Sequence, residues 1–282
     1  MNDIIERLDF DEKNINVLHA EHIVRYSLAI PYVRGKKVLD LACGTGYGSF
    51  FLSLHSQEII GVDISPEAIQ SARKKYQRNN LSFVVSDAMS TPFQDHSFDV
   101  IVSFETIEHI KNDLTFLKEV KRILKQEGLL LLSCPNIVWS KKHDIHNPFH
   151  FREYTEKSIL RLVSSYFKFS SISSQYDVGG SLILHDKLHP STMINLSHNK
   201  HTFPKIPTSY IVLCSDNEKI EIQDLISLAR HETVDDILNL IDYIKQLKLI
   251  LLKEDSKILT LFKIKLGRAL KKSKKLVSFL SK

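Results

Sequence analysis

The stretch that most constrains the fold is 38–49, which reads VLDLACGTGYGS. Its first residues, through Asp40, have the character of the end of a buried parallel strand, and the apolar run at 50–52 can start a helix. The turn between them carries glycines at alternate positions, Gly44, Gly46 and Gly48. Glycine permits positive φ and a close approach of a ligand to the backbone, and a helix N-terminus offers unpaired N–H groups. The stretch therefore predicts a strand, a ligand-binding turn and a helix.

The spacing of this turn separates it from two better-known glycine loops. An aspartate stands four residues before the first glycine, and the glycines then follow as G-x-G-x-G. Dinucleotide enzymes carry G-x-G-x-x-G, and phosphate loops end in Gly-Lys-Ser/Thr. The pattern therefore matches neither of these two loops.

A second strand is predicted at 58–64, and it ends close to Asp63. Ser65 is a natural N-cap with Pro66 at the first helical position, so a helix begins at once. Asp63 follows Asp40 by 23 residues. A carboxylate at the tip of the second strand can accept hydrogen bonds from both ribose hydroxyls of a nucleoside.

Strands and helices alternate through the rest of this region. Further strands are predicted at 81–85, 98–104, 129–133, 169–175 and 210–215, and helices at 15–33, 112–124 and 155–167. This rhythm predicts an α/β fold, a Rossmann-like, doubly wound and mostly parallel seven-stranded sheet. Ligands of such sheets bind at the carboxyl ends of the strands, where Gly44, Asp63, Asp87 and Glu105 all fall.

The composition fits a globular protein of the reducing cytosol. Of the 282 residues, 43% are hydrophobic and 25% charged, and the formal net charge is +5, as in ordinary globular proteins. The three cysteines, Cys43, Cys134 and Cys214, form neither a disulfide framework nor a zinc-ligand spacing. The acidic N-terminus lacks the apolar core of a signal peptide, and no stretch is long enough to span a bilayer. We therefore expect a cytoplasmic protein.

With these elements in place, residues 15–216 resemble the class I S-adenosylmethionine (SAM)-dependent methyltransferases, particularly those of the ubiquinone pathway. The loop at 38–49 and the later NPFHFREYT are also similar to methyltransferases found with polysaccharide-building enzymes. The resemblance implies SAM as cofactor, with the glycine backbone against SAM, Asp63 on the ribose and Asp40 near the methionine amino group. The implied cofactor contacts are Asp40, Ala42, Cys43, Gly44, Gly46, Gly48, Asp63, Ile64, Asp87, Ala88, Phe104 and Glu105.

A candidate catalytic group follows the fourth strand. Glu105, Glu108 and His109 have the spacing i, i+3, i+4, which places them on one face of a helical turn. Two carboxylates and an imidazole can hold Mg²⁺ or Mn²⁺ in a mixed oxygen and nitrogen shell. The group also resembles the metal site of small-RNA 3′-terminal ribose methyltransferases. In that resemblance His150, in HFREYT at 150–155, is the fourth ligand.

Three interpretations of this group stay open. A metal could bind two vicinal hydroxyls of the acceptor and lower the pKa of one. Without a metal, His109 or His150 could act as the general base. In the third interpretation Glu105 contacts the cofactor, while Glu108 and His109 only cap the turn.

The expected methyltransferase domain is 1–216. Within it, 1–34 is a helical cap, and 137–154 and 177–208 are lid or insert segments. On the cap, Arg25 or Tyr26 could meet the SAM carboxylate.

A basic amphipathic helical extension is expected at 217–282. Residues 256–282 carry nine Lys or Arg and no Asp or Glu, interleaved with apolar residues. Such a helix can lie on an anionic membrane surface or pack on its own domain. We do not expect nucleic acid as its partner, because no aromatic stacking platform is interleaved with the charges.

The function expected from the sequence is O-methylation of a sugar hydroxyl in a polysaccharide or glycolipid precursor. The acceptor is then a small molecule or a glycan, and 256–282 could hold the enzyme at the inner face of the membrane. The alternatives are a metal-dependent RNA 3′-terminal ribose 2′-O-methyltransferase and a non-catalytic SAM-binding scaffold at a membrane. The sequence gives no oligomeric state.

Overall fold

The computed structural model describes residues 17–177, 181–185 and 206–218. The chain divides into two units, Met1–His231 and Glu232–Lys282, and every described residue belongs to the first. The predicted extension at 217–282, apart from its first two residues, lies outside the described residues, as do 1–16 of the predicted cap. No helix of the described part combines the length and the apolar character needed to cross a bilayer.

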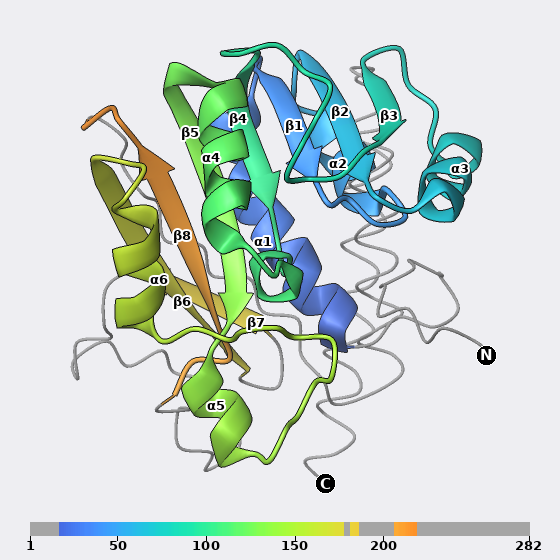
Figure 1. Cartoon of the computed structure of the whole chain (residues 1–282). Coiled ribbons are helices and arrows are strands. Elements are labelled where there is room, and N and C mark those ends of the chain that lie inside the picture. Colours follow the sequence, from blue (N-terminus) through green and yellow to red (C-terminus); the bar gives the residue numbers. More distant parts are fainter. Residues whose placement is uncertain (1–16, 178–180, 186–205, 219–282) are drawn as a thin grey trace, which may run out of the picture. The chain divides into compact units, whose positions relative to one another are not determined.

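An eight-stranded sheet forms the centre of the first unit, in the order β3-β2-β1-β4-β5-β8-β6-β7 (Figure 1). The neighbours from β3 to β5 run parallel, whereas β8 is antiparallel to both β5 and β6, and β7 is antiparallel to β6. The strands are β1 (Lys37–Leu41), β2 (Glu58–Asp63), β3 (Leu81–Val85), β4 (Phe98–Ser103), β5 (Leu124–Pro135), β6 (Phe169–Asp177), β7 (Ser181–His185) and β8 (Ser209–Ser215).

The doubly wound α/β prediction is confirmed, and the count of seven strands is one too few for the described part. The additional strand, β7, lies inside 177–208, which the sequence presents as a lid or insert. It extends the sheet by pairing with β6, for example Gln175 with Ile183. Of that segment, 178–180 and 186–205 lie outside the described residues.

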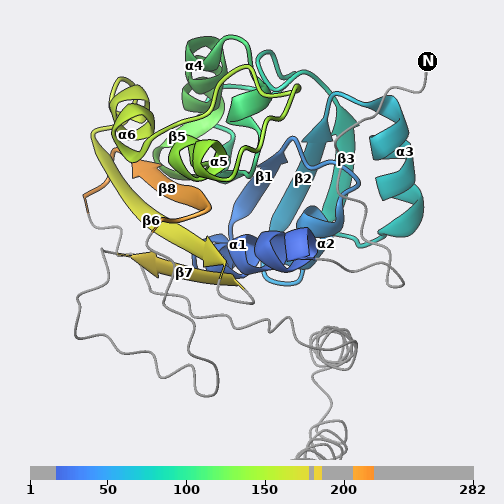
Figure 2. The ribbon, with the colours of Figure 1, turned by 90° about the horizontal axis from the view of Figure 1, so that it is seen from below.

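The helices cover both faces of the sheet (Figure 2). Helices α1 (Val17–Val33) and α2 (Tyr47–Ser53) lie on one face, and α4 (Asp113–Ile123) and α6 (Glu156–Val163) lie on the other. Successive residues of a strand point to opposite faces of the sheet. In β4, Val100 therefore packs in the core under α1 and α2, and Ile101 packs in the core under α4 and α6. The remaining helical elements are α3 (Pro66–Lys75), the 3₁₀ turn η1 (Ile107–His109) and α5 (Ile137–Lys142).

Side-chain caps set the helix starts that the sequence predicts. The Ser65 hydroxyl accepts a hydrogen bond from the Ala68 N–H ahead of α3, and the Asn112 side chain accepts one from Thr115 ahead of α4. Thr155 and Ser158 form a reciprocal capping box at the start of α6. Each cap satisfies an N–H that the first helical turn would leave unpaired.

The order of the strands creates a switch point between β1 and β4. The chain builds outward from β1 to β3 and then returns to place β4 on the other side of β1. The two strands run parallel with Asp40 beside Val102, so their carboxyl ends lie side by side. Ligands of doubly wound sheets bind in the crevice at such a point.

Helix α1 is fixed to the switch point by Tyr26. The Tyr26 hydroxyl donates to both carboxylate oxygens of Asp40, at 3.3 Å each. Its ring lies against Gly48 of α2, where an added Cβ would stand 1.9 Å from Tyr26 Cζ. Gly48 is therefore required by packing of the chain on itself.

We expect Gly48→Ala to lower the free energy of unfolding by about 1–3 kcal/mol, because the methyl group and the Tyr26 ring cannot share the space. Urea unfolding of the full chain measures this cost. In a Tyr26→Ala background the space beside residue 48 is empty, so adding Gly48→Ala should lower the free energy of unfolding by little. Equal costs in the two backgrounds would contradict the packing account.

Candidate functional site

The loop between β1 and α2 has a backbone that is left-handed at three of five positions. Ala42 has φ of 66°, Gly44 of 54° and Gly46 of 84°. The positive φ at Ala42, where most side chains are strained, has no signal in the sequence. The loop is tied to β2 by a hydrogen bond from the Cys43 N–H to the Val62 carbonyl.

The three glycines of this loop have different environments. A Cβ added to Gly46 would lie within 2.8 Å of Phe83 and Ala72 atoms, so this glycine, like Gly48, is required by internal packing. A Cβ on Gly44 would meet nothing within 4 Å. Gly44 is therefore the position where a ligand has room to approach the backbone.

Asp63 closes the loop from the end of β2. One carboxylate oxygen accepts the Gly44 N–H and the other accepts the Ser65 N–H, both at 2.9 Å. A carboxylate has about four lone-pair sites, so these two bonds are compatible with further hydroxyl donors. The predicted ribose ligand is thus also the residue that shapes the glycine loop, a role the sequence alone does not reveal.

Apolar surface lies open beside Asp63. The Ile64 side chain is 64% exposed and Val85, at the end of β3, is 42% exposed. Next to them Asp87 accepts the Met89 N–H at 2.8 Å, and Ala88 is buried. An apolar shelf next to a carboxylate suits a purine ring and its ribose, so these residues fit the nucleoside of SAM.

Asp40 is a buried carboxylate under the loop. It accepts the Ser49 hydroxyl at 2.6 Å as well as the Tyr26 hydroxyl. Burial raises the pKa of Asp40 to about 7 against the lowering effect of these hydrogen bonds. Burial also raises the pKa of the neighbouring Cys43 thiol, so Cys43 is no nucleophile here.

Arg25 is a buried residue whose side chain contacts three other parts of the chain. Its side chain is 1% exposed and donates to Gln175 of β6 at 2.7 Å and to Ser209 of β8 at 3.2 Å. Its Nη1 lies 3.6 Å from Glu105 Oε1. Two nitrogens of the guanidinium donate inside the protein, whereas Nη1 has no hydrogen-bond partner among the described residues. The contact of Arg25 or Tyr26 with the SAM carboxylate stays a prediction.

Glu105 separates from the other members of the predicted metal group. It has φ of 49°, follows the buried Phe104, and lies ahead of the 3₁₀ turn, which begins only at Ile107. The Ser133 hydroxyl accepts the Glu105 N–H at 2.9 Å and donates to Glu105 Oε1 at 2.7 Å. One helical face therefore does not hold all three residues, and Glu105 faces Ser133 and Arg25.

The structure does bring together the other three residues of the predicted set. Ligand atoms of Glu108, His109 and His150 lie within 4.8 Å of one another. The two imidazole centroids are 4.8 Å apart. The segment that carries His150 is held on η1 by hydrogen bonds from the Phe151 and Arg152 N–H groups to the Glu108 carbonyl.

Hydrogen bonds orient both imidazoles of this His/Glu cluster. His150 Nδ1 lies 2.8 Å from Glu153 Oε1, and His109 Nδ1 lies 3.2 Å from the Phe149 carbonyl. With Nδ1 as the donor in each ring, Nε2 is the acceptor. His150 Nε2 lies 2.9 Å from the Asn147 amide nitrogen. Glu153 and Asn147 were not predicted from the sequence, although both stand three residues from His150.

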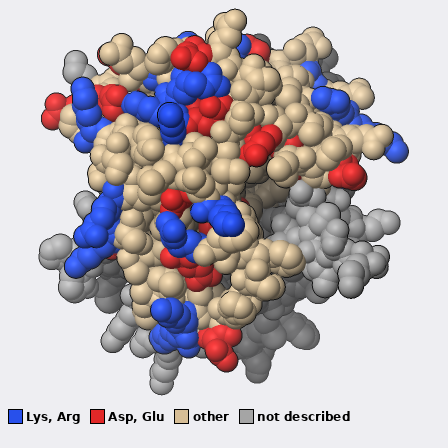
Figure 3. Space-filling model, viewed as in Figure 1, with Lys and Arg blue, Asp and Glu red and all other residues tan. Residues whose placement is uncertain are grey.

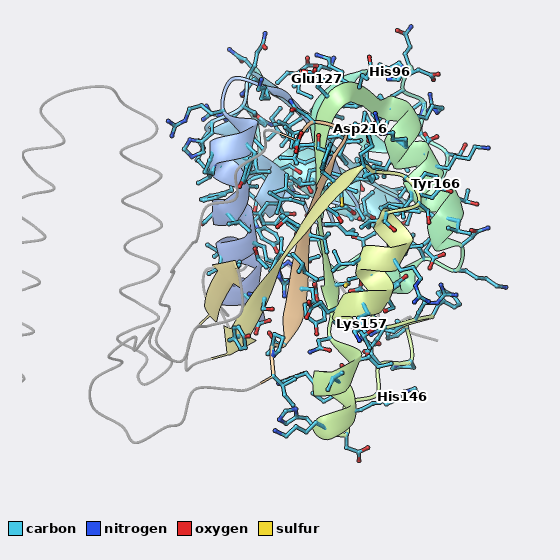
Figure 4. The ribbon with its side chains drawn as sticks, turned by 90° about the vertical axis from the view of Figure 1, so that its left-hand side faces the viewer. His96, Glu127, His146, Lys157, Tyr166 and Asp216 are labelled. Carbon is cyan, nitrogen blue, oxygen red and sulfur yellow. The ribbon has the colours of Figure 1, made fainter. Side chains whose placement is uncertain are left out.

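The other histidines of this segment lie apart from the cluster. His143 Nδ1 contacts the Trp139 carbonyl at 2.9 Å, and the two rings are 4.6 Å apart. Exposed His146 lies at the tip beside α5, at the end of the molecule opposite His96 and Glu127 (Figure 4).

Comparison with known proteins shows what the fold and the region around the glycine loop are similar to. Residues 39–132 match the family described as "Methyltransferase domain". A SAM-dependent methyltransferase from Archaeoglobus fulgidus superimposes with a TM-score of 0.53 over 70% of this chain and 95% of that one, at 19% identity. Residues 39–132 are thus similar to a methyltransferase domain, and the chain has the fold of that solved structure.

Two curated proteins are similar in sequence to this chain, and only one of their names states a substrate. A Mycobacterium tuberculosis protein named "Probable S-adenosylmethionine-dependent methyltransferase" is 33% identical over 150 residues, 52% of this chain and 54% of its own. A Mycobacterium leprae "Phthiotriol/phenolphthiotriol dimycocerosates methyltransferase" is 37% identical over 98 residues, 34% of this chain and 36% of its own. The chain thus spans about half the length, or less, of these relatives.

The buried carboxylate of Asp40 should make the free energy of unfolding depend on pH. A folded-state pKa raised to about 7 means that the native protein holds a proton that the unfolded chain has lost. The Asp40 contribution to stability should therefore fall between about pH 4 and pH 7 as the pH rises. Urea unfolding at a series of pH values should show a flatter profile for Asp40→Asn.

Asp144→Asn is the control for this comparison, because Asp144 is an exposed carboxylate. It should retain the pH profile of the wild type. A profile that is unchanged in Asp40→Asn would show that Asp40 is ionised in the native protein over this whole range.

Proposed function

We propose that the protein is an enzyme that transfers a methyl group from SAM to a hydroxyl of its acceptor. One juxtaposition carries the proposal. Gly44, where a ligand has room beside the backbone, lies in the loop that follows β1. The His/Glu cluster begins after β4, the strand that runs parallel to β1 and pairs with it. Donor and acceptor would then meet at the switch point.

SAM would be held by the loop side of this crevice. Gly44 would face the ligand, Asp63 the ribose, and Ile64 with Asp87 and Ala88 the adenine. The carboxylate of Asp40 would favour the methionine amino group from below the loop. The cofactor supplies an electrophilic methyl on its sulfonium, and the protein supplies position.

His109 is the proposed base on the acceptor side. Its Nδ1 is directed at the Phe149 carbonyl, which leaves Nε2 as the nitrogen that takes up a proton. This imidazole would take up the proton of the acceptor hydroxyl as its oxygen receives the methyl group and the sulfonium leaves as the neutral thioether. His150, oriented by Glu153, would position the hydroxyl or share the role of base.

A divalent metal is the second candidate for this side. Glu108, His109 and His150 offer one carboxylate and two imidazoles, a set that suits Mn²⁺ better than Mg²⁺. The hydrogen bond from His150 to Glu153 has the form that orients a ligating histidine. The Asn147 amide would have to leave His150 Nε2 to admit the ion. A bound metal would lower the pKa of an acceptor hydroxyl.

The proposed acceptor is a sugar hydroxyl of a glycan or glycolipid precursor, on the resemblance to polysaccharide-cluster methyltransferases. One relative is named for phthiotriol and phenolphthiotriol dimycocerosates, so acceptors of related domains extend beyond sugars. An RNA acceptor is less favoured. Figure 3 shows Asp and Glu scattered among Lys and Arg on the face it displays, without the continuous basic track that RNA phosphates attract.

Asp63→Ala tests the cofactor side. Loss of the carboxylate removes both the proposed ribose acceptor and the anchor of the Gly44 N–H, so affinity for S-adenosylhomocysteine should fall by at least about tenfold. Isothermal calorimetry measures this affinity, with Asp95→Ala as the matched aspartate control. Unchanged affinity in Asp63→Ala would overturn the assignment.

Mn²⁺ titration followed by EPR, with S-adenosylhomocysteine present, tests the acceptor side. If the metal candidate is correct, Glu108→Gln and His150→Ala should abolish saturable binding. Glu105→Gln should retain it, because Glu105 lies outside the cluster. Asn147→Ala should tighten it by freeing His150 Nε2.

Binding that is absent in the wild type would retire the metal and leave the imidazole base. Labelled methyl transfer from SAM to glycan, lipid and small-RNA fractions then identifies the acceptor. Cofactor binding without a labelled product in any fraction would favour the non-catalytic scaffold.

A further inference from the structure

The segment beside the proposed acceptor site exposes an unusual amount of apolar surface. In the described part of the chain, eight large apolar side chains are prominently exposed, and four of them lie within 138–151. These are Val138 at 47%, Ile145 at 47%, Phe149 at 44% and Phe151 at 67% exposed. Trp139, half-buried, is the only tryptophan of the chain.

This apolar segment is attached to the site. Phe149 and Phe151 flank His150 in the chain, and the Phe151 N–H donates to the Glu108 carbonyl at 2.8 Å. The Phe149 N–H donates to Asn147 Oδ1 at 3.0 Å. The two phenylalanines are therefore held at the edge of the His/Glu cluster by the backbone bonds that position it.

Basic residues accompany the apolar ones. Lys141, Lys142 and Arg152 are exposed on the same segment, against one exposed carboxylate, Asp144. In Figure 3 the lower part of the displayed face combines uncharged surface with Lys and Arg, and some Asp or Glu lies among them. Aromatic and apolar side chains interspersed with Lys and Arg suit the boundary between the headgroups and acyl chains of an anionic bilayer.

We propose that residues 137–152 dock the protein on an anionic lipid surface and so present a membrane-anchored acceptor to His109 and His150. The proposal rests on the proposed function for the location of the acceptor, and it specifies the acceptor class as lipid-linked. Phe149 and Phe151 enter the interface, Lys141 and Lys142 face the lipid phosphates, and the acceptor headgroup reaches the His/Glu cluster beside them. The membrane contact predicted for 256–282 is a separate prediction, and that segment lies outside the described residues.

The single tryptophan makes the docking directly observable in the full chain. Vesicles of phosphatidylcholine mixed with phosphatidylglycerol should shift Trp139 fluorescence to shorter wavelength, and brominated lipid in the same vesicles should quench it. Vesicles of phosphatidylcholine alone should have little effect, because the attraction of the lysines to lipid phosphates depends on the anionic lipid. Binding by sedimentation without quenching of Trp139 would show that another part of the chain docks, and would overturn the proposal.

Substitutions separate this surface from the basic C-terminal segment. The double variant Phe149→Ser/Phe151→Ser should lower the partition coefficient by at least about tenfold, and Lys141→Gln/Lys142→Gln by about tenfold. Phe169→Ser is the matched control, because Phe169 is 40% exposed and pairs with Ser215 at the opposite end of the sheet. Equal partitioning of the double phenylalanine variant and this control would refute the docking.

Calorimetry with S-adenosylhomocysteine on each variant keeps the two proposals apart. The double variant Phe149→Ser/Phe151→Ser and the control Phe169→Ser should bind S-adenosylhomocysteine as the wild type does, because all three residues lie outside the glycine loop. Vesicle docking requires no turnover, so its failure leaves methyl transfer intact. A failure of cofactor binding in the wild type would reject the methyltransferase and not the docking surface.

Discussion

The buried guanidinium of Arg25 is the interaction on which the acceptor end of the sheet depends. A fully buried charge costs several kcal/mol unless it is paired and hydrogen-bonded. Its partners come from three distant parts of the chain, Gln175 of β6, Ser209 of β8 and Glu105 after β4. The two hydrogen bonds tie helix α1 to the antiparallel strands, and Nη1, which makes no hydrogen bond within the described part of the chain, lies near the Glu105 carboxylate.

The regular elements could be predicted from the sequence because their signals are local. Ser65 with Pro66, Asn112 and Thr155 start the helices that the structure contains, and the spacing of apolar runs sets the parallel strands. The fate of Glu105 could not be predicted in this way. It depends on a partner 80 residues earlier in the chain and on a helical turn that begins two residues later than the spacing assumes. Strand β7 likewise depends on its pairing with β6.

The two sides of the proposed site come from separate parts of the chain. The residues that fit the cofactor follow β1, β2 and β3, whereas the acceptor candidates lie on η1 and on the segment after β5. The match to the methyltransferase family ends at residue 132, inside β5 and ahead of that segment. The matched residues therefore include η1 as well as the strands and loops that fit the cofactor, whereas the segment at 137–152 lies outside the match.

All three cysteines of the chain are buried, and burial raises the pKa of each thiol. Cys43 lies in the cofactor loop, Cys134 near the end of β5 and Cys214 in β8. In the closed structure each thiol is protonated and shielded, so alkylating reagents and peroxide reach it only when its own region opens. The chain therefore carries three native reporters of local unfolding. The rate at which each is labelled records separately how often the cofactor loop, the acceptor end and the antiparallel strands come apart.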